Sequence, residues 1–122
     1  MDRIKFGAML KLLADAWTDR EYALVASQFA EDVFYSDPRN YTFRDRQSLL
    51  AFFSDDDGLP QSCTFHNWIF DEEQQLGVAE LTYVGTYRYH GTVWIEVRNG
   101  QIVSWREYQH ISDKDWDEFW QR

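Results

Sequence analysis

The sequence has a single cysteine, Cys63, and no apolar run long enough to cross a membrane. One cysteine cannot form a disulfide within the chain, and it cannot build a thiolate metal site. A membrane-spanning helix needs about 20 consecutive apolar residues. The first residues alternate charged with apolar side chains and do not form the apolar core of a signal peptide. We therefore expect a cytoplasmic protein without a membrane partner.

Basic residues are also scarce, with 12 Lys and Arg against 21 Asp and Glu and a formal net charge of −9. This charge repels phosphate backbones, so the sequence argues against a nucleic acid partner. The three histidines, His66, His90 and His110, lack the spacing of paired metal ligands. Neither a glycine-rich phosphate loop nor a Gly-x-Ser-x-Gly nucleophile motif is present. We expect no metal and no cofactor.

Aromatic residues, in contrast, are abundant, and six Trp, seven Tyr and nine Phe make up 18% of the chain. This is more than the core of a small domain needs, so it favours an aromatic pocket or interface. The 122 residues lie near the commonest size for one domain and contain no linker or repeat. We expect one domain over residues 1–122.

The N-terminal half of the chain has helical periodicity. Apolar residues at helical spacing predict a helix from about Asp2 to Trp17. Thr18 to Glu21 has the pattern of a capping box, which predicts a second helix that ends near Ala30. A third helix is expected after Asp45, which has the side chain of an N-cap, and it should end before Asp55.

Strands are expected next to and after these helices. Val33 to Ser36 is predicted to be a short strand that stops at the Asp37-Pro38 dipeptide, because proline cannot donate to a ladder. The C-terminal half has the composition and length of successive strands. The predicted strands are Cys63 to Asp71, Leu76 to Tyr89, Thr92 to Arg98 and Gln101 to Ile111.

The last two strands flank Asn99-Gly100, a hairpin turn whose positions both need positive φ, so they should be antiparallel neighbours. A short terminal helix carrying Trp116, Phe119 and Trp120 should lie at an edge or close over the mouth of a pocket. The order of elements predicts an α+β fold in which the helices cover one face of a curved antiparallel sheet.

Alternation along the long second strand divides its side chains between two faces. Leu81, Tyr83 and Tyr87 give one face a large aromatic character, whereas the other face is small and mixed. A partly apolar second face suits a dimer interface, although an exposed β-branched surface is the alternative. We expect the chain to form a homodimer through the sheet face that carries Val78, Glu80, Val84 and Arg106.

Three segments resemble the nuclear-transport-factor-2-like superfamily and, within it, SnoaL-like domains. They are FAEDVFYSDP (Phe29 to Pro38), GVAELTYVGTY (Gly77 to Tyr87) and HGTVWIEVRNGQIVSWREY (His90 to Tyr108). The resemblance implies a cone-shaped fold with three N-terminal helices on a curved antiparallel sheet, a deep pocket between them, and commonly a homodimer. The superfamily includes isomerases, cyclases, dehydratases, epoxide hydrolases and proteins that only bind, so the fold does not fix a reaction.

By this resemblance, Asp37 matches the position of the general base in the ketosteroid isomerase members. A carboxylate in an aromatic cavity has its charged form disfavoured, which makes it more basic. The alternative is structural, because Asp before Pro commonly forms turns. The two oxyanion donors of those isomerases have no match, because their positions fall on Leu13 and near Trp94. Steroid isomerisation by that arrangement is therefore not expected.

Three more polar residues are candidates for the same site. Glu107 shares strand parity with Trp105 and would face the pocket as a second acid, unless a bulge reverses it. Tyr35 would offer its hydroxyl to Asp37 or to a ligand oxygen, or else only pack. His110 lies near the position of an acid/base carboxylate in several SnoaL-like members, or else on the surface.

The helix stripe and the strand parity aim a set of aromatic residues at one interior, which predicts a pocket lined by Trp17, Tyr35, Phe52, Phe65, Tyr83, Tyr87, Trp94 and Trp105. Three functions remain open: a carrier or sensor for a small apolar molecule, a cofactor-independent isomerase, cyclase or dehydratase that uses Asp37, and an interaction module. The abundant aromatics and the missing oxyanion donors favour binding.

Overall fold

The computed structural model describes residues 1–37 and 41–120. The elements in chain order are α1 (Arg3–Thr18), α2 (Tyr22–Ser27), β1 (Phe29–Asp37), β2 (Tyr41–Phe43), α3 (Arg46–Ser54), β3 (Ser62–Asp71), β4 (Leu76–Val84), β5 (Arg88–Arg98), β6 (Gln101–Ile111) and α4 (Trp116–Phe119). The six strands form one sheet in the order β2-β1-β6-β5-β4-β3. This α+β architecture agrees with the predicted fold class. No helix in the described part of the chain is long and apolar enough to span a membrane.

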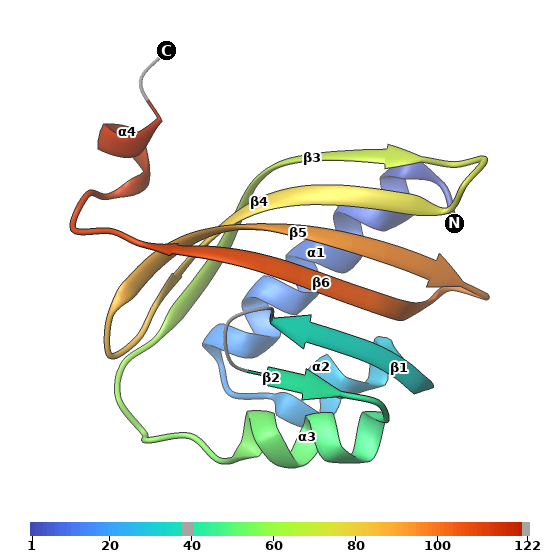
Figure 1. Cartoon of the computed structure of the whole chain (residues 1–122), viewed down its shortest axis with the longest axis horizontal. Coiled ribbons are helices and arrows are strands. Elements are labelled where there is room, and N and C mark those ends of the chain that lie inside the picture. The colour runs from blue at the N-terminus through green and yellow to red at the C-terminus, as the bar shows by residue number, and fades with distance from the viewer. Residues whose placement is uncertain (38–40, 121–122) are drawn as a thin grey trace.

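The sheet is strongly curved, and β5 and β6 cross in front of α1 in Figure 1, with α3 beside β1 and β2. Neighbouring strands are antiparallel except for β1 and β6, which run parallel. The expectation of a purely antiparallel sheet is therefore wrong. Because β1 and β6 are far apart in the sequence, no tight hairpin sets their relative direction.

Local signals explain the two longer helices. The Asp2 side chain accepts the Lys5 amide N–H at 2.8 Å and starts α1, and Asp45 accepts the Ser48 amide N–H at 2.7 Å and starts α3. Both helices begin and end close to their predicted bounds. The predicted capping box at Thr18 is wrong, because the Thr18 hydroxyl donates to the Ala14 carbonyl and Glu21 makes no side-chain cap.

The boundary between α2 and β1 also differs from the prediction. The helix ends at Ser27, not near Ala30, and β1 starts at Phe29, four residues before the predicted strand. Phe29 pairs in register with Ile102 of β6, and both side chains are fully buried. Pairing with a distant strand thus overrides the helical spacing of the local sequence. The short strand β2 was not predicted.

The chain reverses at residues 85–87, earlier than the predicted break between Tyr89 and Thr92. The Gly85 amide N–H donates to the Tyr87 carbonyl at 3.0 Å and closes the turn, whereas Gly91 lies inside β5 and pairs with Leu81. A Cβ at Gly91 would lie 3.0 Å from the Tyr108 carbonyl oxygen, so glycine here permits close strand approach. The predicted Asn99-Gly100 hairpin is confirmed, with φ of 52° and 76°.

The core lies between the inner face of the sheet and the helices α1 and α3. Near the start of α1 it is filled, because Phe6 stacks on Phe70 with ring centroids 4.5 Å apart. Phe6 also lies so close to Gly77 that a Cβ there would be 2.3 Å from its ring. Toward the end of α1, Trp17 packs edge-on against Trp105 and Phe53. Beyond this aromatic layer the packing opens into a cavity.

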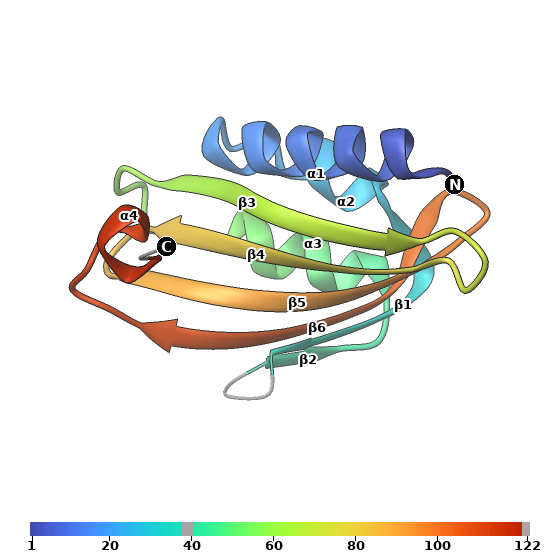
Figure 2. The same cartoon turned by 90° about the horizontal axis from the view of Figure 1, so that it is seen from above.

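The terminal helix α4 lies at the end of the sheet where β3 begins and β6 ends, as Figure 2 shows. Trp116 stacks on His66 with ring centroids 3.9 Å apart, and Phe119 stacks on His90 at 4.7 Å. His66 and His90 are joined through Thr82, whose hydroxyl lies 2.7 and 2.8 Å from their ring nitrogens. The helix therefore packs on the outer face of the sheet and does not close the cavity.

Candidate ligand-binding and acid/base site

A cavity of about 340 Å³ opens between the inner face of the sheet and the helices α1 to α3. Its lining contains eleven aromatic residues, five acidic residues and a few others. The lining residues are Trp17, Tyr22, Tyr35, Asp37, Tyr41, Phe52, Phe53, Asp55, Asp56, Asp57, Gln61, Cys63, Phe65, Leu81, Tyr83, Tyr87, Tyr89, Trp105, Glu107 and Gln109.

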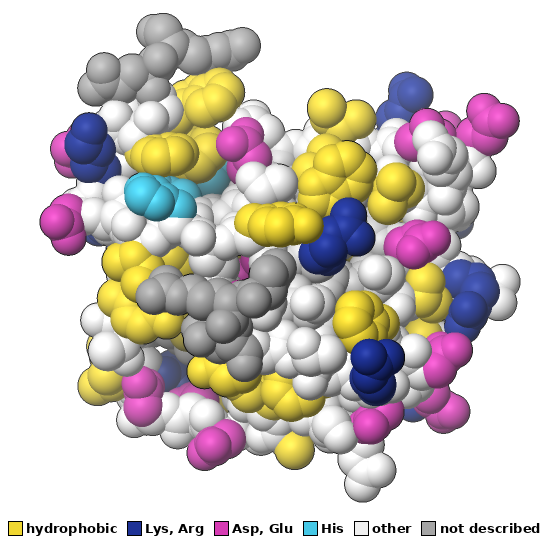
Figure 3. All heavy atoms as spheres, viewed as in Figure 1, with side chains coloured by type: hydrophobic (Ala, Val, Ile, Leu, Met, Phe, Trp, Pro, Cys, Tyr) yellow, Lys and Arg dark blue, Asp and Glu magenta, His cyan; other side chains and the backbone are white. Residues whose placement is uncertain are grey.

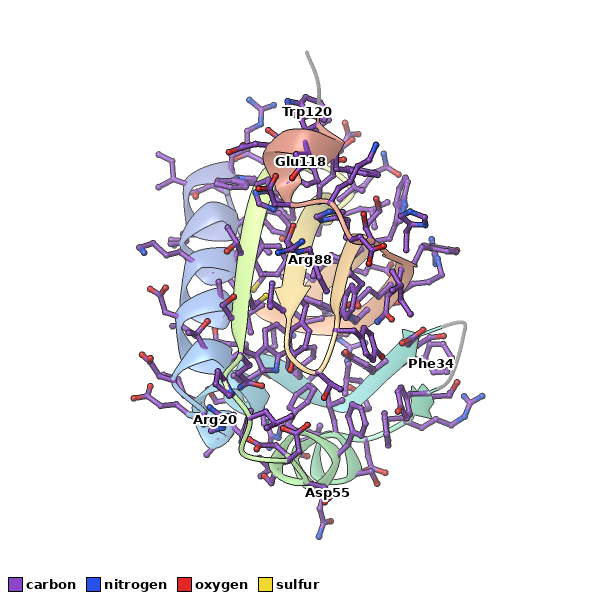
Figure 4. The ribbon with its side chains drawn as sticks, turned by 90° about the vertical axis from the view of Figure 1, so that its left-hand side faces the viewer. Arg20, Phe34, Asp55, Arg88, Glu118 and Trp120 are labelled. Atoms are coloured by element: carbon purple, nitrogen blue, oxygen red, sulfur yellow. The ribbon has the colours of Figure 1, made fainter. Side chains whose placement is uncertain are left out.

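The open end of the cavity faces the viewer in Figure 4, which labels Asp55 at the end of α3 and Arg88 at the start of β5. The exposed lining residues belong to this end: Tyr41 is 44% exposed, Tyr87 is 50% exposed, and the three aspartates that follow α3 are all exposed. The deep end is formed by Trp105 and Glu107 of β6, which are almost fully buried.

Glu107 is a buried carboxylate held by three donors. Its Oε1 accepts the Trp105 indole N–H at 3.0 Å, and its Oε2 accepts the Tyr89 hydroxyl at 3.1 Å and the Gln109 amide at 2.7 Å. Burial raises the pKa of Glu107, the three hydrogen bonds lower it, and the nearby charge of Asp37 raises it further. The net pKa is raised, because the loss of hydration outweighs the donors.

Asp37 ends β1 with its side chain turned to the inner face, and it is 5% exposed. The parallel register pairs Tyr35 with Trp105 and Ser36 with Arg106, so the next pair in that register is Asp37 and Glu107. The two carboxyl groups are therefore brought to the same wall of the cavity by the pairing of β1 with β6. Pro38, the second half of the predicted strand stop, lies outside the described residues.

Tyr35 lies near enough to both carboxyl groups to be affected by their charges, and it is 8% exposed. Burial raises the pKa of its phenol well above the usual value, and the neighbouring charges of Glu107 and Asp37 raise it further. Its hydroxyl makes no hydrogen bond within residues 1–37 and 41–120. No sealed-off polar side-chain atom in the described part lacks a partner, so this hydroxyl faces the cavity space. It is a protonated donor available to a ligand.

The outer part of the cavity has a second polar network. The Tyr83 hydroxyl donates to Gln61 at 2.8 Å, and the Tyr22 hydroxyl donates to Asp56. Asp56 also accepts from Arg20 at 3.0 Å, which ties the segment after α3 to the end of α1. Gln61 and the three aspartates after α3 were not predicted as lining residues, since their positions depend on a loop that has no periodicity. Tyr22, the first residue of α2, was not predicted as a lining residue either.

The structure brings most of the predicted residues to the cavity, but Trp94 lies elsewhere. Trp94 pairs with Val78 and Arg106 on the outer face and is 40% exposed. Its neighbours Val93 and Ile95 point inward and are fully buried. The parity of β5 therefore excludes Trp94 from the lining, and the aromatic residue that β5 contributes is Tyr89, which was not predicted.

The last strand, β6, carries Glu107 and His110 on its two opposite faces. Glu107 lines the cavity, whereas His110 is exposed on the outer face next to Phe119. The strand parity predicted for Glu107 is therefore confirmed, and His110 is the surface histidine.

Two further residues considered in the sequence take no part in chemistry at this site. Leu13 is fully buried in the core and has no donor to offer. Burial raises the pKa of Cys63 to about 12, which keeps its thiol protonated and unreactive. No three His, Cys, Asp or Glu side chains of the described residues are grouped to hold a metal ion.

Comparison with known structures places the fold in a familiar group. A ketosteroid isomerase-like fold protein from Catenulispora acidiphila, solved with trimethylamine, has 18% identity, a TM-score of 0.71 and coverage of 82% of this chain and 83% of its own. A Methylobium petroleophilum protein of unknown function with a cystatin-like fold has 15% identity, a TM-score of 0.77 and coverage of 100% and 93%. An M. tuberculosis LEH-like epoxide hydrolase has 15% identity, a TM-score of 0.72 and coverage of 84% and 80%.

These identities establish likeness of fold and nothing about reaction. A comparison with curated protein sequences gave no match. The family model of the SnoaL-like domain matches residues 10–105, which contain α2 to β5, most of α1 and the first half of β6. The chain belongs to the SnoaL-like domain family.

Proposed function

We propose that the cavity binds a small, mainly apolar molecule with an oxygen function, and that Asp37 transfers a proton to or from it without a cofactor. The observation that carries this proposal is the hydroxyl of the largely buried Tyr35, a donor that faces the cavity near two buried carboxyl groups. Because this hydroxyl is open to the cavity space, it can donate to an oxygen atom of a bound ligand.

The chemistry follows from the roles that each group can take. Asp37 accepts a proton from a carbon next to a carbonyl, and Tyr35 donates a hydrogen bond to the oxygen on which negative charge develops. The raised pKa of Tyr35 keeps its proton in place during this step. Glu107, whose pKa is also raised, is the second carboxyl group and can return a proton at another atom of the ligand. This is the chemistry of isomerases, cyclases and dehydratases.

Two further observations support this over a passive carrier or an interaction module. An apolar carrier gains nothing from two buried carboxyl groups, because burying each costs hydration energy. An interaction module needs no hollow centre, whereas this fold keeps about 340 Å³ open. The Catenulispora protein was solved with trimethylamine, which supports a small ligand in this fold.

The test uses Asp37→Asn and Tyr35→Phe with a panel of enolisable ketones in D₂O, following deuterium uptake at the α-carbon by NMR. We expect the wild type to catalyse uptake and Asp37→Asn to lose it while still binding the ketone, because an amide cannot accept the proton. Tyr35→Phe should slow uptake roughly 100-fold or more, the usual cost of losing one oxyanion donor.

The matched control is Tyr83→Phe, since Tyr83 lines the same cavity but its hydroxyl is already bonded to Gln61. It should change uptake by less than about threefold, because its hydroxyl takes no part in the transfer. Full activity in Asp37→Asn would remove the catalytic role and leave a binding protein. Native mass spectrometry of the purified protein would identify a co-purified ligand in either case.

We also propose that two copies pair through the outer face of the sheet. Figure 3 shows this face, with hydrophobic side chains over its middle and most of the visible acidic side chains toward its rim. Trp94 and Ile69 on this face are 40% and 72% exposed. Arg106 lies over the Trp94 ring at 5.9 Å. Glu80 lies on the same face, so a two-fold pairing would let each Arg106 approach an acidic partner.

A further inference from the structure

The three groups that hold Glu107 differ in what each can do with a proton. The Trp105 indole N–H, 3.0 Å from Oε1, can only donate. The Gln109 amide donates to Oε2 at 2.7 Å, and an amide does not release its protons at ordinary pH. The Tyr89 hydroxyl, 3.1 Å from the same Oε2, can both donate and accept. Of these three groups, Tyr89 is therefore the one that can take a proton from Glu107 and pass its own proton on.

Tyr89 connects the deep carboxyl group to the space in which a ligand would lie. Glu107 is 3% exposed, so it offers little surface to a bound molecule. Tyr89 is only partly buried and also lines the cavity. Its ring stacks on Tyr83 with centroids 5.4 Å apart, and the Tyr87 ring lies 6.4 Å away. These neighbours hold the Tyr89 ring in a fixed position beside the cavity.

The direction of the hydrogen bond between Tyr89 and Glu107 depends on the protonation of Glu107. When Glu107 is ionised, the Tyr89 O–H points at Oε2. When Oε2 carries a proton, the phenol must turn its own O–H away, because two protons cannot lie between the two oxygen atoms. The Tyr89 oxygen then accepts from Glu107. Since the described residues give the Tyr89 hydroxyl no second partner, its O–H becomes available to a ligand.

Tyr89 does not release its proton by itself. Burial raises the pKa of its phenol well above the ordinary value, and the nearby charge of Glu107 raises it further. A phenolate next to an ionised Glu107 would place two negative charges in a buried space. Release of the Tyr89 proton to a ligand must therefore be coupled to the arrival of a proton from Glu107.

We propose that Tyr89 is a catalytic residue, which gives its proton to the ligand and receives the proton of Glu107 in the same step. This transfer is called the Tyr89 relay below. The inference rests on the proposed function, since it concerns the return of a proton after Asp37 has removed one.

The relay conserves atoms and charge. The Tyr89 O–H bond breaks as an atom of the enolate takes the proton, and the Glu107 O–H bond breaks as its proton moves to the Tyr89 oxygen. The ligand becomes neutral, Tyr89 ends as a neutral phenol, and Glu107 ends as a carboxylate. The three donors around Glu107 then stabilise this carboxylate. Exchange with water after product release returns a proton to Glu107 and removes the one that Asp37 took.

The test follows cyclohex-3-en-1-one in D₂O by NMR, because the enolate of this small ketone has two fates. Return of a deuteron at the α-carbon by Asp37 gives labelled starting ketone, whereas return at the γ-carbon gives the conjugated cyclohex-2-en-1-one. The ratio of the two products does not depend on how fast the enolate forms. We expect Tyr89→Phe, which keeps the ring, to lower the ratio of conjugated to labelled ketone by roughly 100-fold, the usual contribution of a general acid. Uptake at the α-carbon should stay within about threefold of the wild type.

A second variant and a matched control complete this experiment. Glu107→Gln should lower the ratio in the same way, and combining it with Tyr89→Phe should lower it no further, because the two residues act as one unit. Tyr108→Phe is the control, since it removes a tyrosine hydroxyl next to Glu107 in the sequence. Tyr108 is 49% exposed on the outer face, where its hydroxyl accepts from Arg106, so this variant should leave the ratio unchanged.

Infrared spectroscopy examines the hydrogen bond without any substrate. The C=O stretch of protonated Glu107 is the band that appears as the pH is lowered and is absent in Glu107→Gln. If Tyr89 accepts from protonated Glu107, this band should move to higher frequency in Tyr89→Phe, because the acceptor is lost. It should stay in place in Tyr108→Phe. An unchanged band in Tyr89→Phe would contradict the relay.

The outcomes separate the relay from the proposed function. If Tyr89→Phe keeps the wild-type ratio while Glu107→Gln lowers it, Glu107 reaches the ligand directly, and the relay is wrong while the proposed function stands. Uptake at the α-carbon without any conjugated ketone in the wild type would also overturn the relay and leave the role of Asp37 intact. If the wild type takes up no deuterium from any enolisable ketone, the proposed function fails, and the relay fails with it as a catalytic step.

Discussion

Tyr35 and Trp105 stack across the parallel pair of β1 and β6, with ring planes 7° apart and centroids separated by 5.9 Å. The same Trp105 indole donates to Glu107 at 3.0 Å. One aromatic side chain thus positions both the free hydroxyl and one of the two buried carboxyl groups. The rigidity of the site depends on the register between two strands that are far apart in the sequence.

The variant Trp105→Phe should therefore destabilise the fold. It removes ring area from a side chain that is 1% exposed and leaves Glu107 with one donor fewer. We expect the free energy of unfolding to fall by about 2 to 4 kcal/mol. Urea denaturation followed by circular dichroism would measure this loss. The matched control, Trp94→Phe on the outer face, should cost less than about 1 kcal/mol, and an equal loss in both variants would contradict the argument.

The fold could largely be predicted from the sequence because its signals are local. Asp45 caps the helix that it was expected to cap, α1 begins next to Asp2 as predicted, and Asn99-Gly100 forms the expected hairpin. The errors lie where distant contacts decide. Phe29 has helical spacing but pairs with Ile102, and Trp94 faces outward because the reversal at Gly85 sets the register of β5.

The candidate site was predictable to the extent that it follows strand parity. Tyr35, Asp37 and Glu107 reach the cavity because each occupies an inward position on its strand. The three donors to Glu107 were not foreseen as a group. Gln109 lies on β6 with Trp105 and Glu107, whereas Tyr89 joins them only through the pairing of β5 with β6, and Tyr89 was assigned to a different strand. The acidic residues of the open end lie on an irregular segment after α3, where no sequence pattern indicates which way a side chain points.

The buried Glu107 should make stability depend on pH. Its pKa in the folded chain is raised above the ordinary value of 4.5, chiefly by burial. The stability that it contributes is therefore fully present below the unfolded pKa and is lost as the pH rises through the folded pKa. Glu107→Gln cannot ionise and should escape this loss. Denaturation of both proteins between pH 4 and pH 8 should show the variant gaining relative to the wild type as the pH rises.

The slope of this relative gain should not exceed about 1.4 kcal/mol per pH unit, the limit for one proton. Asp32→Asn is a suitable control, since Asp32 is an exposed partner of Arg98 and should show no such trend. A constant difference between Glu107→Gln and the wild type across this range would show that Glu107 keeps one protonation state.

The proposed pairing through the outer face leads to a prediction about assembly. We expect the purified protein to be a dimer at micromolar concentration, and Trp94→Asp to shift it to a monomer by placing a charge in the apolar middle of the interface. Light scattering coupled to size exclusion gives the mass directly. Ile4→Asp is the control, because Ile4 is 85% exposed on α1, away from the sheet face, and should leave the mass unchanged.

The last prediction concerns how α4 is held on the sheet. His66 stacks on Trp116 and lies 2.7 Å from the Thr82 hydroxyl, which in turn bonds to His90. Burial lowers the pKa of His66 below its ordinary value of 6.5, and the nearby His90 lowers it further, against smaller opposing effects of Glu80 and Asp117. Detached from Trp116, His66 would therefore bind a proton more readily than in the packed state. Docking of α4 should weaken as the pH falls below about 6.5.

The measurement is limited proteolysis at the peptide bond after Lys114 between pH 5 and pH 8. The cleavage rate of an unstructured peptide at each pH corrects for the pH dependence of the protease itself. Cleavage should accelerate toward pH 5 in the wild type. His66→Phe keeps the stacking on Trp116 but cannot take a proton, so its pH dependence should be clearly smaller. His90 also contacts Phe119 and bonds to the Lys114 carbonyl at 2.9 Å. The variant His90→Gln therefore separates the contribution of His90 to the pH dependence from that of His66. Equal acceleration in wild type and His66→Phe would assign the effect to His90 or to neither histidine.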